Sequence, residues 1–231
     1  MSEQTEENYG ILSFNEIPFY FREGNFGDLY TIRENLNGKQ YKQLKLSTSD
    51  IILDIGGHIG TFAVPLAKKV QKIATVEMDL SNYKLLEANV RFYNNIIPLN
   101  KAVVADDSSD IQVQYYKASK NSGAHSMYVK RQRGAPFIAN TIKIGELLSV
   151  YKPTIIKCDI EGAEYDIFNS ELKLPDFVKQ IIIEFHFGRK KFRTLANITI
   201  ANLQSQGFTP SDTSNMNDNK NWTRVIYFER S

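Results

Sequence analysis

The chain has 231 residues, of which 42% are hydrophobic and 23% are charged, and this profile is typical of one soluble globular domain. Its 28 basic and 26 acidic side chains leave a formal charge of +2, so neither nucleic acid nor an anionic membrane is favoured as the main partner. A single cysteine, Cys158, excludes an internal disulfide, and the acidic start MSEQTEENYG is unlike a signal peptide. We therefore expect a cytoplasmic protein, and no apolar run approaches the roughly 18 residues of a membrane span.

The first 49 residues differ in pattern from the rest of the chain. Residues 1–8 are polar and acidic, which predicts disorder. Residues 9–49 contain short aromatic and β-branched runs separated by Gly and Asn, which predict a small β-rich lead-in with a helix before Asp50. We expect a single domain to follow, over residues 50–231.

From residue 51 onward the hydrophobic pattern alternates between strand and helix periods. Strands are predicted at 51–55, 72–77, 96–106, 111–117, 153–160, 179–187 and 221–230. Helices are predicted at about 60–70, at 81–94 with Ser81 as N-cap, at 142–152, from 163, and at 193–207, where Gly207 ends the helix. The strands are continuous apolar runs, so the pattern predicts an α/β fold with a mostly parallel sheet covered by helices on both faces.

A glycine-rich turn, DIGGHIG, follows the first predicted strand of this sheet. Ligands of parallel sheets bind outside the carboxyl ends of the strands, and Gly56 and Gly57 would leave bare main chain there. Gly60 would let the next helix start close to the sheet. Glu77 ends the second strand, roughly 20 residues on, where an acid can accept both hydroxyls of an adenosine ribose. A tight strand-to-helix turn would explain the glycines equally well without a ligand.

The details of the turn indicate which adenosine cofactor would fit. The motif is not G-x-G-x-x-G, and no Lys-Ser or Lys-Thr pair follows it, which disfavours a phosphate cradle. Asp54, expected at the mouth of the site, would repel a pyrophosphate but suits a ligand with an amino group and a sulfonium. The better fit is S-adenosyl-L-methionine (SAM), with S-adenosyl-L-homocysteine as the product.

Three segments resemble the FkbM family of class I SAM-dependent methyltransferases. These are ILDIGGHIGTFAVPLA, VEMDLSNYKLLEANVRFYN and IIKCDIEGAEYDIF, and IIIEFH is similar to the family's following strand. His58 stands where Asn is usual, and Met78 where Pro is usual. The resemblance implies a Rossmann-like, mostly parallel seven-stranded sheet flanked by helices, and O-methylation of hydroxyl groups. The cofactor-binding candidates are Asp54, Gly56, Gly57, His58, Gly60, Glu77, Met78 and Asp159.

The third segment carries the candidate catalytic residues. A hydroxyl acceptor needs a proton sink, and Asp159, Glu161 and His186 are the candidates, with Lys157 as the partner that orients Asp159. Strand alternation puts Lys157 and Asp159 on one side of their strand, and Glu184 and His186 share a side of the next. The structural alternatives are a helix cap for the two acids and a core histidine for His186.

Other polar residues are candidate substrate contacts. They are Glu164, Glu184, and His125 in a loop that would act as a lid. For Glu164 the alternatives are an acid at the surface and an acid that supports another site residue from behind. The basic stretch YVKRQRGAP is read as a solvated loop, with phosphate or nucleic-acid contact as the alternative. Magnesium or manganese would suit the carboxylates, but no spacing is specific enough to assign metal ligands.

The leading hypothesis is a SAM-dependent O-methyltransferase for a hydroxyl of a small molecule or of a sugar or glycan. One alternative is a methyltransferase for nucleic acid or protein, although the Asn/Asp-Pro-Pro-aromatic motif of exocyclic-nitrogen methylases is missing from the sequence. Another alternative is a non-catalytic SAM-binding interaction module.

Overall fold

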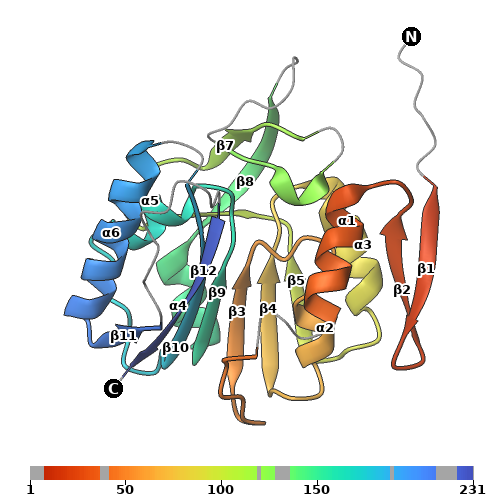
Figure 1. Ribbon diagram of the computed structural model, residues 1–231, viewed down its shortest axis with the longest axis horizontal. Coiled ribbons are helices and arrows are strands. Elements are labelled where there is room, and N and C mark those ends of the chain that lie inside the picture. The colour runs from red at the N-terminus through yellow and green to blue at the C-terminus, as the bar shows by residue number, and fades with distance from the viewer. Residues whose placement is uncertain are drawn as a thin grey trace.

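The computed structural model describes residues 8–36, 42–118, 121–127, 136–187, 190–211 and 223–230. Its centre is a seven-stranded sheet in the order β11-β12-β10-β9-β3-β4-β5 (Figure 1). β3, β4, β5, β9 and β10 are parallel, and β12 is antiparallel to both of its neighbours. The predicted mostly parallel, seven-stranded sheet is confirmed. The strands are β3 (Ile51–Ile55), β4 (Lys72–Val76), β5 (Ile96–Leu99), β9 (Ile155–Cys158), β10 (Gln180–His186), β11 (Phe208–Pro210) and β12 (Thr223–Arg230).

Helices bury both faces of this sheet, as the continuous apolar strands predicted. Within β3, Ile52 belongs to one buried cluster and Leu53 to the other, because successive side chains point to opposite faces. The first cluster includes side chains of α2 (Ala63–Leu66) and α3 (Leu80–Val90). The second includes side chains of α4 (Ile144–Tyr151), α5 (Glu164–Phe168) and α6 (Lys190–Ser205). None of the described helices is long and apolar enough to cross a membrane.

The residues before the sheet form a hairpin and a helix that pack on the first cluster. The hairpin pairs β1 (Tyr9–Phe14) with β2 (Ile17–Arg22), and Phe19 inserts into the core with 1% of its surface exposed. α1 (Phe26–Thr31) follows and continues as a π-helix, η1 (Ile32–Leu36). The hairpin lies beyond α3 at the edge of the molecule (Figure 1).

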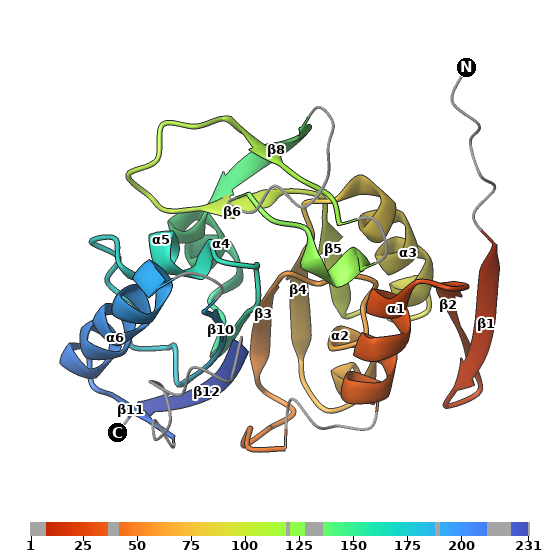
Figure 2. The same ribbon diagram turned by 45° about the horizontal axis from the view of Figure 1, so that its top comes forward.

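A separate three-stranded sheet, in the order β6-β8-β7, lies above the carboxyl ends of the parallel strands (Figure 2). It consists of β6 (Ala102–Val104), β7 (Gln112–Tyr115) and β8 (Phe137–Lys143). The sequence does not predict β8. This strand pairs with β6 and β7, which are distant in the chain, and no hairpin turn marks the pairing. A short 3₁₀ helix, η2 (Ser122–Ala124), lies between β7 and β8 in the chain.

Two helix starts differ from the prediction. Gly60 has φ +92°, outside the helical region, and beyond Leu66 the backbone makes i to i−3 bonds, so regular α-helix in the predicted 60–70 stretch is confined to α2. The N-cap of α3 is Asp79 and not Ser81. Its carboxylate accepts hydrogen bonds from the backbone N–H groups of Ser81 (2.9 Å) and Asn82 (3.0 Å).

Candidate active site

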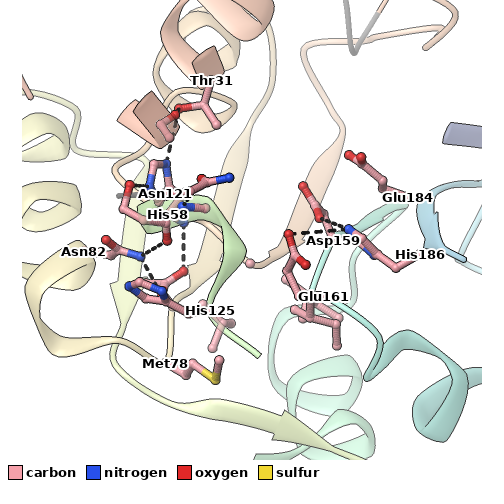
Figure 3. Close-up of a pocket in the computed structure, with 18 of the residues that line it drawn as sticks. Thr31, His58, Met78, Asn82, Asn121, His125, Asp159, Glu161, Glu184 and His186 are labelled. Carbon is pink, nitrogen blue, oxygen red and sulfur yellow. Dashed lines mark hydrogen bonds and ion pairs between the residues drawn. The ribbon is translucent and has the colours of Figure 1, made fainter. Parts of the chain in front are cut away.

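The parallel strands end at a cavity of about 280 Å³, near the lower limit for small-molecule sites. β3 and β9 are neighbours in the sheet. The strand that follows β3 lies on one side of this pair, and the strand that follows β9 lies on the other. α/β sheets bind ligands at such a reversal of strand order. Figure 3 shows two groups of polar side chains that face each other across this cavity. One group comes from the N-terminal segment, α3 and the η2 loop, and the other from the ends of β9 and β10.

The glycine turn forms the floor between the two groups, but only one of its glycines lines the cavity. Gly56 lines it with φ +87°, and a Cβ there would lie 1.9 Å from the backbone oxygen of Asp159. A Cβ on Gly57 would lie 2.1 Å from Oγ1 of Thr75, and Gly60 packs against α3. Of Gly56 and Gly57, which were expected to expose main chain to a ligand, only Gly56 reaches the cavity, and its contact with a ligand stays a prediction. Gly57 and Gly60 are needed for another reason: a side chain at either position would come too close to neighbouring protein atoms.

Asp54 and Lys157 lie behind the turn, and neither lines the cavity. Asp54 is fully buried, accepts a hydrogen bond from Oγ1 of Thr75 (2.8 Å), and is 3.2 Å from Nζ of Lys157. The predicted position of Asp54 at the mouth of the site is therefore wrong. Lys157 also donates to the carbonyl of Gly56 (2.8 Å). Burial opposes its charge, but Asp54 and Asp159 raise the pKa of Lys157 above its ordinary value, so it fixes the turn as a cation.

Glu77 faces the cavity from the end of β4. Its Oε2 accepts the backbone N–H of His58 (2.9 Å) and its Oε1 that of Asp79 (2.9 Å), so the carboxylate is held against the glycine turn. Burial raises the pKa of Glu77, and the nearby His58 opposes the rise. Met78, Ala102 and Val103 add an apolar surface next to it. Glu77 therefore lies where the sequence analysis expected a ribose contact.

His58 connects the glycine turn to the N-terminal segment. Its Nε2 lies 2.7 Å from Oγ of Ser122 and 3.3 Å from Oδ1 of Asp28, and its Nδ1 lies 3.3 Å from Oγ1 of Thr31. Asp28 is fully buried, and its carboxylate also accepts hydrogen bonds from Nε (2.9 Å) and Nη2 (2.7 Å) of Arg22. Both ring nitrogens of His58 thus face protein groups. A contact of this ring with the cofactor stays a prediction.

His125 also lines the cavity, on the same side as Asn82 and Met78 (Figure 3). Its Nδ1 accepts the backbone N–H of Ala118 (3.1 Å), and burial lowers its pKa to about 4. It is therefore neutral at pH 7, and it lies across the cavity from Asp159 (Figure 3). A contact of His125 with a substrate stays a prediction.

The opposite wall gathers Asp159, Glu161, Glu184 and His186 (Figure 3). Nε2 of His186 lies 3.8 Å from Oδ1 of Asp159 and 3.7 Å from Oε1 of Glu161. Burial opposes its positive charge, but the surrounding carboxylates, Glu164 first, raise the pKa of His186 to about 10. The raised pKa favours the imidazolium form of His186 at neutral pH, and its role as a proton sink stays a prediction.

Glu184 has the opposite property. Burial, and then the neighbouring Asp159, raise the pKa of Glu184 to about 7, while His186 opposes the rise. A general base works best when its pKa is near the working pH, and Glu184 meets this condition.

Glu164 is fully buried and does not line the cavity, which contradicts a substrate contact and a surface position and agrees with the alternative of an acid that supports another site residue. Its Oε2 accepts the backbone N–H of Gly162 (2.8 Å), and its Oε1 lies 3.0 Å from the backbone nitrogen and 3.2 Å from Nδ1 of His186. The hydroxyl of Tyr165 donates to the carbonyl of His186 (2.8 Å). Glu164 is therefore a positioning residue for His186.

The structure places neither Asp159 nor Glu161 at the N-cap of α5, which is Ala163. Among the described ranges, no group of three or more His, Cys, Asp or Glu side chains is arranged to hold a metal ion.

The family profile described as the Methyltransferase FkbM domain matches residues 54–210, well over half of the chain. The chain belongs to the FkbM methyltransferase family. This membership confirms the predicted family and its Rossmann-like class, and the expected SAM cofactor agrees with it.

Two curated proteins and one solved structure illustrate how far the likeness of this FkbM chain extends. It is 27% identical over 142 residues to the hexuronic acid methyltransferase AglP of Haloferax volcanii, covering 60% of this chain and 57% of that protein. It is 23% identical over 91 residues to ribosomal RNA small subunit methyltransferase A of Caldanaerobacter subterraneus, covering 39% and 34%. The chain thus spans only about a third to just over half of these relatives. An FkbM methyltransferase crystal structure from Methylobacillus flagellatus has a TM-score of 0.51 at 18% identity, covering 80% of this chain and 45% of that one, and shows the fold alone.

The FkbM signature residues have two different places in this structure. Asp159 and Glu161 line the cavity, whereas Lys157 and Glu164 hold the turn and His186 from behind. The substituted positions His58 and Met78 both line the cavity as well. The lining residues that the sequence analysis missed lie mainly in the N-terminal segment, β6 and the η2 loop. They include Gly27, Tyr30, Thr31, Glu34, Lys101, Ala102, Val103, Asn121, Ser122 and Thr223, with Asn82 from α3.

Proposed function

We propose that this chain is the catalytic unit of a SAM-dependent O-methyltransferase that acts on a hydroxyl of a small molecule or of a sugar or glycan. The observation that carries the proposal is that one cavity joins the glycine turn and Glu77 to Asp159, Glu161, Glu184 and His186. The first pair suits an adenosyl ligand, and the second group suits a reaction in which a hydroxyl loses its proton.

The residues present fit SAM. Gly56 brings bare main chain to the cavity floor, Glu77 offers carboxylate oxygens for a ribose, and Met78, Ala102 and Val103 offer an apolar surface for an adenine. When bound, SAM supplies an electrophilic methyl group on a sulfonium. The chain's own task is then to hold the acceptor oxygen in line with that methyl group and to take its proton, and positioning of this kind can supply much of the acceleration.

Glu184 is the proposed general base. At pH values above about 7 its carboxylate is ionised and can accept the acceptor's hydroxyl proton as the oxygen–methyl bond forms. His186, held as an imidazolium by Glu164, keeps its positive charge beside Asp159 and Glu161. It offers an N–H donor that can orient the acceptor and balances part of the negative charge of this wall.

The charges of the lining favour a neutral, hydroxyl-rich acceptor. Glu34, Asp159, Glu161 and Glu184 all line the cavity, and carboxylates accept hydrogen bonds from hydroxyl groups. The pKa of Tyr30 is raised to about 12 by its hydrogen bond to Glu34, by burial and by the charge of Glu184, and all three residues line the cavity. Lys101 is the one Lys or Arg among the described lining residues.

A second candidate acceptor is RNA, because the curated relatives include ribosomal RNA methyltransferases. The acidic lining opposes this candidate, since a phosphate backbone would meet more carboxylates than cations there. The relative named as a hexuronic acid methyltransferase supports a sugar acceptor, and the acidic lining favours a neutral sugar over an anionic hexuronate.

The first experiment is calorimetric titration of the purified chain with SAM and with S-adenosyl-L-homocysteine. We expect both to bind, and we expect Glu77→Gln to weaken binding about 10- to 100-fold, because a charged hydrogen-bond acceptor for the ribose is lost. Glu87→Gln, an exposed change on α3, is the control and should bind as the wild type does. A folded wild-type chain that binds neither ligand would overturn the proposal.

The second experiment identifies the bond that is formed. The chain is incubated with SAM labelled in its methyl group and with neutral hexosides, hexuronates, aromatic and aliphatic alcohols, and ribosomal RNA. We expect label in a hydroxyl compound that resists mild alkali, because ethers resist it and methyl esters do not. Label found only in RNA would exclude a small-molecule or glycan acceptor, and label found only in alkali-labile esters would exclude hydroxyl methylation.

A further inference from the structure

A second hollow, separate from the active-site cavity, is lined by residues of the N-terminal hairpin, α3 and the start of β8. Its volume is about 780 Å³. Five large apolar side chains in it are 46–63% exposed, which is unusual for a concave surface of a monomer. They are Tyr9, Ile11, Leu80, Phe137 and Ile138. We call this surface the apolar hollow.

Three cations line the apolar hollow, and no acidic side chain is among the described residues that line it. Lys84 is exposed and has no hydrogen bond or ion pair with the described parts of the chain. Arg91 donates to the hydroxyl of Tyr20 (2.9 Å) and stacks on its ring (5.2 Å). Lys117 lies over Phe137 (4.4 Å), and the buried Asp79 (2.6 Å) neutralises its charge. Lys84 and Arg91 thus leave a local positive charge that the total of +2 conceals.

We propose that the apolar hollow docks this chain on the surface of an anionic lipid bilayer. Interfacial protein surfaces combine exposed aliphatic and aromatic side chains with Lys and Arg, because the first enter the acyl boundary while the second meet lipid phosphates. The apolar hollow carries both sets within one surface. This inference does not depend on the proposed methyl transfer.

The composition of the apolar hollow favours lipid over the other polyanions. Single-stranded nucleic acid and sugars are held by flat aromatic rings, on which bases and sugar faces stack. Ile11, Leu80 and Ile138 are branched aliphatic side chains with no flat face, and they gain most from contact with hydrocarbon. Tyr9 and Phe137 are of the aromatic kind that is enriched at membrane interfaces.

The place of the apolar hollow gives the docking a geometric consequence. α3 begins at Leu80, three residues after Glu77, so this surface and the active-site cavity lie on either side of the same helix start. A chain docked in this way would keep its cavity close to the headgroup layer, within reach of hydroxyl groups carried on lipids.

The test is co-flotation of the full chain with phosphatidylcholine vesicles that contain either no phosphatidylglycerol or about 30% of it. We expect binding to the anionic vesicles, weakened by salt, and little binding to the neutral ones. Lys84→Glu should weaken binding at least about fivefold, because each cation at such a surface contributes about that factor. Ile138→Asp should weaken it at least as much.

Matched controls separate this surface from general effects of charge or polarity. Val150→Asp changes a side chain on α4 that is 66% exposed, against 63% for Ile138, and Lys68→Glu makes the same charge change as Lys84→Glu. Both controls should bind as the wild type does. Equal binding to neutral and anionic vesicles, or controls as weak as the test variants, would overturn the proposal. So would a wild-type dimer that Ile138→Asp dissociates, or tight binding of single-stranded RNA with none to vesicles.

Discussion

Replacement of Glu164 by Gln tests whether a buried charge pair holds the acidic wall together. Glu164 has no exposed surface, and its two oxygens meet three N–H groups, of Gly162 and of the backbone and ring of His186. In Glu164→Gln the negative charge is lost, and the amide NH₂ must face one of these donors. The free energy of unfolding should therefore fall, because a buried donor loses its acceptor and a buried imidazolium loses its strongest counter-charge.

The size of the loss follows from the pKa of His186. A rise from 6.5 to about 10 corresponds to about 5 kcal/mol, shared among Glu164, Glu161 and Asp159. Glu164 makes the shortest of these contacts, so we expect it to account for about 3 kcal/mol, within the range for breaking a buried pair. For a chain of this size the melting temperature should fall by about 6–12 °C.

The pH dependence of this loss distinguishes the charge pair from ordinary packing. The pKa of His186 is raised in the folded state, so its stabilising contribution is complete below pH 6.5 and is lost as the pH rises through 10. The difference between wild type and Glu164→Gln should therefore be large at pH 7 and should shrink toward the value of the lost backbone hydrogen bonds, about 1–2 kcal/mol, above pH 10.

The measurement is chemical unfolding of both proteins at neutral and at high pH, with Glu229→Gln as the control. Glu229 pairs with Lys45 at 2.6 Å, but both side chains are more than half exposed, and this change should cost less than about 1 kcal/mol. A loss in Glu164→Gln that is the same at both pH values, or no larger than that of the control, would refute the charge-pair reasoning.

Two further predictions concern the turn and the base. Gly56→Ala should unfold the chain or lower its free energy of unfolding by more than about 3 kcal/mol in urea titration, because the new Cβ would lie 1.9 Å from the backbone oxygen of Asp159. The control is Gly24→Ala, where φ is +74° but no atom lies within 4 Å, and it should cost about 1 kcal/mol. A similar cost for both would show that close approach is not what requires Gly56. For the proposed base, kcat should rise with pH through about 7, where Glu184 ionises, and Glu184→Gln should lower kcat about 10²- to 10⁴-fold with little change in the Kd for SAM. A Glu184→Gln enzyme with an unchanged pH profile would assign the proton to another group.

The sequence alone determined the central sheet and its ligand-binding edge. Continuous apolar strands alternating with helices allow little besides a parallel sheet covered on both faces, and the carboxyl ends of its strands must share one edge. The glycine turn, Glu77 and the acidic segment after β9 were therefore expected at that edge, and they line the cavity there. These are local patterns joined by a topology with few alternatives.

Only the tertiary structure decided which of the polar residues face the cavity. Asp54 and Glu164 belong to the same motifs as Gly56 and Glu161, but they are turned inward, because Thr75, Lys157 and His186 supply buried partners for their charges. The protonation of His186 also depends on carboxylates brought together from separate elements.

The N-terminal segment and β8 were beyond the sequence for a related reason. The sequence pattern predicts a hairpin and a helix before Asp50, but not that Asp28 will meet His58 and Ser122 to close one side of the cavity. Likewise, β8 is a strand only because β6 and β7 lie on either side of it. The hydrophobic periodicity of a segment indicates whether it forms a helix or a strand and which face it buries. Contacts between elements distant in the chain depend instead on how their side chains fit together, which no single segment contains.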